Sequence, residues 1–88
     1  MTRPRVVITG VGGLTPLAND MKSTWKKLLV GESGIAPITL FDASTYDSRI
    51  AGEVKNFTAE DHIPVKQARR MDRFTQFAVV SAQMLLAD

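Results

Sequence analysis

The sequence predicts an α/β protein, and three stretches carry this prediction. Residues 5–10 form an apolar, β-branched run that is typical of a buried strand. Residues 21–29 place apolar side chains on one side of a helix, and residues 74–88 indicate a longer helix that is apolar on more than one side. A buried strand and helices with apolar faces are expected to pack in layers.

The first stretch, Arg5–Val6–Val7–Ile8–Thr9–Gly10, is expected to form a central strand because both of its faces are apolar. Gly10, Gly12 and Gly13 follow, and they favour a tight turn or a close approach of backbones. A dinucleotide-binding fingerprint would need glycine at its sixth position, where this chain has Thr15. We therefore expect a structural turn without a cofactor, which weakens a nucleotide-binding enzyme as an alternative.

The helix over residues 21–29 has start and stop signals at both ends. Asn19 and Asp20 offer side-chain oxygens to free backbone N–H groups, and Gly31 suits the left-handed position after a helix. Trp25 lies on the apolar stripe, so we expect it to be a packing residue. The helix is expected to cover the first strand.

The middle of the chain is expected to hold an ordered loop, a strand and a short helix. Residues 35–47 combine turn formers with apolar side chains and predict the loop, and residues 49–54 predict an edge strand weakened by Gly52. A short helix is expected from Pro64 to about Arg70, and Asp72 is expected to cap the long helix. The main apolar stripe of that long helix is expected to comprise Phe74, Phe77, Ala78, Ser81 and Leu85.

Composition excludes several kinds of site. The 88 residues contain no cysteine and one histidine, so they offer no disulfide, no thiolate nucleophile and no Cys- or His-based metal cluster. His62 is expected to be a surface or capping residue. The carboxylate pairs Asp42 with Asp47 and Glu60 with Asp61 are expected to form turns. We therefore assign no catalytic, cofactor-binding or metal-binding residue.

Charge and hydropathy bear on partners and location. The net charge of +2 is too small to imply nucleic acid, and no stretch approaches the length of a membrane span. The N-terminal residues lack the apolar core of a signal peptide, so a cytoplasmic protein is expected. Residues 74–88 show no helix-ending signal, and their apolarity is typical of a helix inside a large protein. We expect these 88 residues to be part of a longer chain.

A basic run near the C-terminus is the most informative surface feature. Lys66, Arg69, Arg70 and Arg73 are spaced at i, i+3, i+4 and i+7, so a continuous helix would project all four from one face. If Asp72 breaks the helix, the first three still share a face. Such a cluster is either a solvated helix face or a docking patch for an acidic partner.

Several blocks of the sequence together form a recognisable pattern. In chain order they are Arg5–Val6–Val7–Ile8–Thr9–Gly10–Val11–Gly12, Thr24–Trp25–Lys26, Leu29–Val30–Gly31–Glu32–Ser33–Gly34–Ile35, Phe41–Asp42, Ala51–Gly52–Glu53–Val54 and Arg69–Arg70–Met71–Asp72–Arg73–Phe74–Thr75–Gln76–Phe77–Ala78. They resemble the N-terminal portion of the β-ketoacyl-acyl carrier protein synthases, most closely the synthase II type of bacterial fatty-acid synthesis. The ketosynthase subunits of aromatic polyketide synthases begin similarly.

The resemblance implies a thiolase fold, a layered α/β/α/β/α architecture made of two similar halves, usually in a homodimer. Residues 1–88 would be an incomplete N-terminal part of the first half. The family elongates acyl chains by decarboxylative condensation with malonyl-acyl carrier protein. Its cysteine nucleophile and two histidines lie downstream of the region matched here, and His62 matches no catalytic position.

The resemblance also gives the basic run a partner. Lys66, Arg69 and Arg70 match positions at which the family docks its acidic acyl carrier protein, loaded with acyl or malonyl groups. Nothing is carried over for Arg73. The alternatives are a polyketide ketosynthase subunit and a standalone basic α/β module that binds an acidic protein or RNA. The leading interpretation involves neither nucleic acid nor a membrane.

Overall fold

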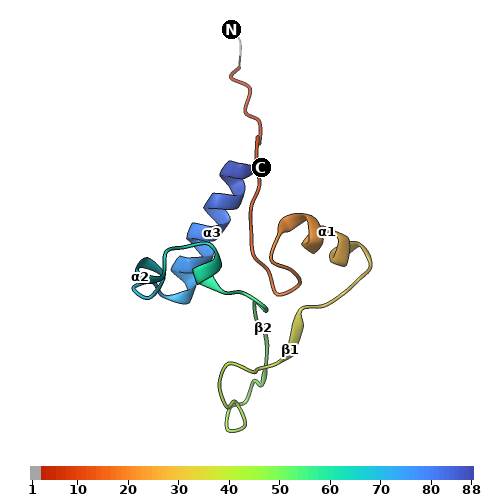
Figure 1. Ribbon diagram of the computed structural model, residues 1–88. Helices are drawn as coiled ribbons and strands as arrows, with labels where there is room; N and C mark the ends of the chain where they lie inside the picture. Colours follow the sequence, from red (N-terminus) through yellow and green to blue (C-terminus); the bar gives the residue numbers. More distant parts are fainter. Residues whose placement is uncertain (1–2) are drawn as a thin grey trace.

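The computed structural model describes residues 3–88 as three helices and a small sheet joined by long irregular segments (Figure 1). A 3-10 turn, η1, precedes the second helix. The presence of both helices and strands agrees with the predicted α/β class, although the described residues form only a part of such a fold. In chain order the elements are α1 (Met21–Leu29), β1 (Ile35–Pro37), β2 (Ile50–Gly52), η1 (Ala59–Asp61), α2 (Val65–Ala68) and α3 (Arg73–Ala87).

Helix α1 begins and ends where its local signals predict. The Asp20 carboxylate caps the helix by accepting hydrogen bonds from Ser23 N at 2.7 Å and Ser23 Oγ at 3.0 Å. These bonds, the backbone one first, hold the pKa of Asp20 below its ordinary value. Gly31 has a φ of +77°, and the N–H of Glu32 donates to the Lys27 carbonyl. This pattern is a Schellman motif, so both predicted caps are confirmed.

Strands β1 and β2 form an antiparallel hairpin, with Ala36 opposite Ala51 at its centre. The predicted strand at residues 49–54 is confirmed in a shorter form. Strand β1 falls within the segment expected to be a loop, so that prediction was wrong for residues 35–37. Pro37 is tolerated at this place because the strand has a neighbour on one side only within residues 3–88.

Residues 5–10 do not form the predicted strand. The chain is extended there, but Val6 is 92% exposed and Ile8 is 85% exposed. A strand needs a hydrogen-bonding neighbour, and the only sheet in the described residues is the β1–β2 hairpin. The segment instead projects past the C-terminal end of α3 (Figure 1). Only its last part reaches the helix, where Gly10 lies against Leu85 and Val11 N donates to Asp88 Oδ2 at 3.0 Å. Helix α1 therefore has no strand to cover, and Trp25 is 60% exposed.

A small core forms where α3 packs against η1 and α2. Its four buried residues are Ala59, Ile63, Ala68 and Val80. The predicted stripe on α3 was partly wrong, because Val80, which was not part of it, is buried and Phe74 is 72% exposed. Phe77 is half-buried, in agreement with the prediction. The partly buried side chains packed against this core are Leu14, Phe57, Met71, Val79 and Met84.

The described chain is drawn out rather than spherical. Its radius of gyration is 16.6 Å, whereas a compact domain of this length would have about 12 Å. The hairpin and the loop at its tip extend away from the helices (Figure 1). No helix within residues 3–88 has both the length and the apolar composition needed to cross a bilayer.

Candidate docking site

Helix α2 is a single turn held between two short loops. Pro64 precedes it, and its carbonyl accepts from the N–H groups of Gln67 and Ala68, both at 2.9 Å. The helix ends at Ala68 rather than near Arg70 as predicted. Arg69 is its last partly helical residue, and Arg70 N donates to Gln67 O in a tighter turn.

The three predicted docking cations lie on the outer side of this turn. Lys66, Arg69 and Arg70 are all exposed, whereas Ala68 is 1% exposed and packs into the small core. Ile63, just before the helix, is also buried at 3%. One side of the segment is therefore fixed to the core, which leaves its cations on the solvent side.

Arg73 does not join this cluster, although its spacing allowed it to. Its Nη2 atom donates to Val54 O at 2.8 Å, and its guanidinium lies 4.9 Å from the centre of the Phe77 ring. A second ring, that of Phe57, lies 6.0 Å away. The i+7 relation fails because α2 ends at Ala68 and a new helix begins at Arg73. The basic cluster, defined as Lys66, Arg69 and Arg70, therefore has three members.

Two glutamines of α3 attach the α2 segment to the long helix. Gln76 Nε2 donates to the carbonyl of Ala68 at 3.1 Å, and Gln83 Nε2 donates to the carbonyl of His62 at 3.3 Å. The His62 side chain is exposed, and its ring stacks on Phe57 with centroids 6.0 Å apart. These contacts could not be predicted from the sequence, because the pattern of a helix does not show which distant group a polar side chain on it will contact.

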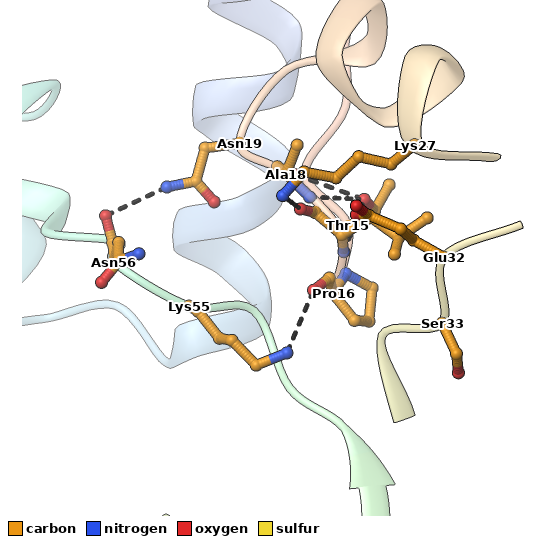
Figure 2. A pocket seen from close by; sticks show the side chains of 10 residues that line it. Thr15, Pro16, Ala18, Asn19, Lys27, Glu32, Ser33, Lys55 and Asn56 are labelled. Atoms are coloured by element: carbon orange, nitrogen blue, oxygen red, sulfur yellow. Dashed lines mark hydrogen bonds between the residues drawn. The ribbon is translucent and has the colours of Figure 1, made fainter. Parts of the chain in front are cut away.

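A polar cavity of about 280 Å³ lies between the loop before α1 and the segment after β2 (Figure 2). Lys27 Nζ donates to Leu17 O at 2.8 Å, and Lys55 Nζ donates to Pro16 O at 3.2 Å. The Thr15 hydroxyl accepts from two backbone N–H groups of its own loop, those of Leu17 and Ala18, each at 3.2 Å. These contacts tie the loop at residues 15–19 to the surrounding segments, so the polar lining serves the architecture.

The carboxylates singled out in the sequence are placed in loops and turns. Asp42 accepts a hydrogen bond from Ser44 N at 3.0 Å, which makes it a turn former and lowers the pKa of its carboxyl. Glu60 and Asp61 lie within η1, and both are exposed. Within residues 3–88 no three metal-ligating side chains gather at one place.

The family follows from comparison with known proteins. A sequence profile described as "Beta-ketoacyl synthase, N-terminal domain" matches residues 3–88. The chain belongs to this family. The family implies a thiolase-like α/β fold, and the family resemblance found in the sequence is thereby confirmed. The match places both the basic cluster and the exposed segment at residues 5–10 in the N-terminal domain of a β-ketoacyl synthase.

Curated relatives give the subgroup and the extent of the match. A protein of Staphylococcus aureus (strain COL) named 3-oxoacyl-[acyl-carrier-protein] synthase 2 is 55% identical over 84 residues, which are 96% of this chain and 20% of that protein. A protein of the same name from Synechocystis is 46% identical over 88 residues, all of this chain and 21% of that protein. The chain thus spans about one fifth of the length of the curated relatives it matches.

Proposed function

We propose that this chain supplies the N-terminal part of a 3-oxoacyl-[acyl-carrier-protein] synthase that elongates fatty acyl chains. The observation that carries the proposal is the 55% identity to a synthase 2 over 96% of the chain, together with the family match over residues 3–88. Residues 1–88 would then form an incomplete part of the first thiolase-like half. The full-length enzyme, meaning the complete gene product, would be an acyltransferase.

The condensing chemistry itself would be supplied outside these residues. The reaction needs a thiol that holds the acyl group as a thioester, and a hydroxyl side chain does not replace it here. The 88 residues contain no cysteine, and their single histidine, His62, lies in the α2 region with its ring on Phe57. We therefore assign the present segment a scaffold role and predict that it is inactive alone.

The basic cluster would be the part of this segment that meets a substrate. Lys66, Arg69 and Arg70 are exposed on one short segment, and the relatives' name specifies an acyl carrier protein. Exposed cations accelerate the encounter with an acidic protein and set its orientation. We propose that these three residues form part of the surface that docks the loaded carrier.

The relatives' names favour the fatty-acid enzyme over the polyketide ketosynthase, since both proteins compared are called synthase 2. The homodimer and the cytoplasmic location are proposed from the family resemblance alone. A standalone module that binds an acidic protein or RNA is the remaining alternative, and it predicts carrier binding or RNA binding without any condensing activity.

A chimera tests the proposed function directly. Residues 5–88 replace the matching segment of the Staphylococcus aureus synthase 2, and the purified chimera is assayed for elongation of acyl groups with malonyl-acyl carrier protein. We expect condensation that is lost on alkylation of cysteine, with the unmodified Staphylococcus enzyme as the matched control. A chimera that melts cooperatively at the control's temperature but does not condense would contradict the proposal.

A further inference from the structure

Helix α2 cannot fix the orientation of its own cations. It has four residues, and forming the first turn of a helix is unfavourable without outside support. Arg69 and Arg70 follow its last residue, so their backbones depend on how the end of the turn is held. The support must come from contacts with another element.

Gln76 makes such a contact at the point where the cations begin. Its Nε2 atom donates to Ala68 O at 3.1 Å, and the same carbonyl accepts from Met71 N at 3.1 Å. The Ala68 carbonyl belongs to the peptide bond that leads into Arg69. Two donors therefore hold this oxygen, one from α3 and one from the residue that follows Arg70, and together they restrain the turn that carries Arg69 and Arg70. Gln76 is half-buried on α3, a helix of 15 residues.

We propose that Gln76 is a positioning residue for carrier docking, acting through Arg69 and Arg70. This inference rests on the proposed docking function of the basic cluster. Because Gln76 holds the Ala68 carbonyl, the two guanidinium groups are presented from a fixed backbone. Without that hold, binding the carrier would first have to order the turn, and the affinity would fall accordingly.

Gln83 provides a matched control on the same helix. It also donates through Nε2 to a main-chain carbonyl of the α2 region, that of His62 at 3.3 Å. That carbonyl precedes α2 and lies on the far side of Pro64 from the arginines. If any glutamine contact between α3 and this region were sufficient, removal of either glutamine would have the same effect.

The test compares Gln76→Met with Gln83→Met in the full-length enzyme. Methionine keeps the length and the helix preference of glutamine but cannot donate. We expect Gln76→Met to raise the KM for carrier-bound acyl substrate about 3- to 10-fold, as the loss of one hydrogen bond allows. Its kcat, its melting temperature and its activity on a small carrier-free acyl thioester should match those of Gln83→Met.

A second pair of variants distinguishes the two proposals. In an Arg69→Glu/Arg70→Glu background, Gln76→Met should add nothing further to the KM. If charge reversal raises the carrier KM but Gln76→Met behaves like Gln83→Met, the positioning role is overturned and docking stands. Equal loss of carrier-bound and carrier-free activity in Gln76→Met would show a structural role and overturn it too. If charge reversal leaves the carrier KM unchanged, the docking proposal itself fails.

Discussion

At the scale of single residues, glycines set how closely the N-terminal segment approaches α3. A Cβ on Gly12 would clash with Ser81 O and lie 2.7 Å from Leu85 N. A Cβ on Gly10 would lie 2.6 Å from Leu85 O. These are backbone atoms of a helix, which cannot move aside as a flexible side chain would. The glycine cluster that resembles part of a nucleotide fingerprint therefore serves close packing.

We predict that Gly12→Ala destabilises the full-length enzyme by about 1–3 kcal/mol, because an added methyl group overpacks the contact with α3. Gly13→Ala is the matched control, since its added Cβ would meet only the flexible Met21 side chain, at 2.8 Å from Sδ and 3.5 Å from Cγ. Urea denaturation measures both. Equal stability of the two variants would show that residues 10–12 are free to move away from the helix.

At the scale of elements, the carboxylate of Glu53 fastens the loop between the two strands. It follows β2 and accepts from the Thr39 hydroxyl at 2.8 Å and from Leu40 N at 3.1 Å. The Thr39 hydroxyl bond, followed by the backbone bonds and the nearby Lys55 charge, lowers the pKa of Glu53 below its ordinary 4.5. The loop that carries Phe41 and Tyr46 is therefore anchored at its β1 end, through Thr39 and Leu40.

The pH dependence of this anchor has a definite sign. A carboxyl with a lowered pKa in the fold adds stability above its unfolded pKa, and that stability is lost as the pH falls through the folded pKa. We therefore expect Glu53→Gln to lower the melting temperature at pH 7, with the difference from wild type disappearing well below pH 4.5. Glu60→Gln serves as the surface control. A difference that stays constant across this range would rule out the carboxylate anchor.

The elements also show which features the sequence could predict. Helix α1 was predictable from Asp20 to Gly31, because its signals act within one turn of each end. Strand β1 was missed and the strand at residues 5–10 was wrong, because a strand depends on partners that are distant in the sequence. The exposed cations of the basic cluster were predicted. The contact of Arg73 with the Phe77 ring and the hydrogen bond from Gln76 to the Ala68 carbonyl were not predicted, because both depend on tertiary structure.

At the scale of the whole molecule, large apolar side chains remain exposed on several elements. Val6 is 92% exposed, Leu86 is 85% exposed and Trp25 is 60% exposed. Apolar surface of this extent is typical of a region that makes further contacts with protein, ligand or membrane. In the proposed full-length enzyme, the remaining sheet and helices would cover it.

We therefore predict that residues 1–88 expressed alone are oligomeric or poorly folded, and that the single tryptophan reports the difference. Trp25 should emit at longer wavelength in the separate segment than in the full-length enzyme, where we expect it to be buried. In the full-length enzyme, Trp25→Ala should then lower the free energy of unfolding by about 3–5 kcal/mol. Light scattering and fluorescence measure the two properties. A monodisperse monomer with a sharp cooperative melt would favour the standalone module instead.

Docking of the carrier is the central property that we propose for the whole molecule. Lys66, Arg69 and Arg70 are exposed, so water and salt screen each charge and the contribution falls mainly on encounter and affinity. Reversing Arg69 and Arg70 to glutamate removes the attraction without disturbing the buried Ala68 beneath them. The fold and the melting temperature should therefore hardly change.

The most direct measurement is the KM of the Arg69→Glu/Arg70→Glu enzyme for carrier-bound and carrier-free acyl substrates at low and high salt. We predict that capture of the carrier-bound substrate weakens by about 1–3 kcal/mol at low salt, as expected for charge-assisted contacts, and by less at high salt. The carrier-free substrate should react as it does with the wild-type enzyme. Equal loss for both substrates, or no loss for either, would show that the basic cluster is only a solvated surface.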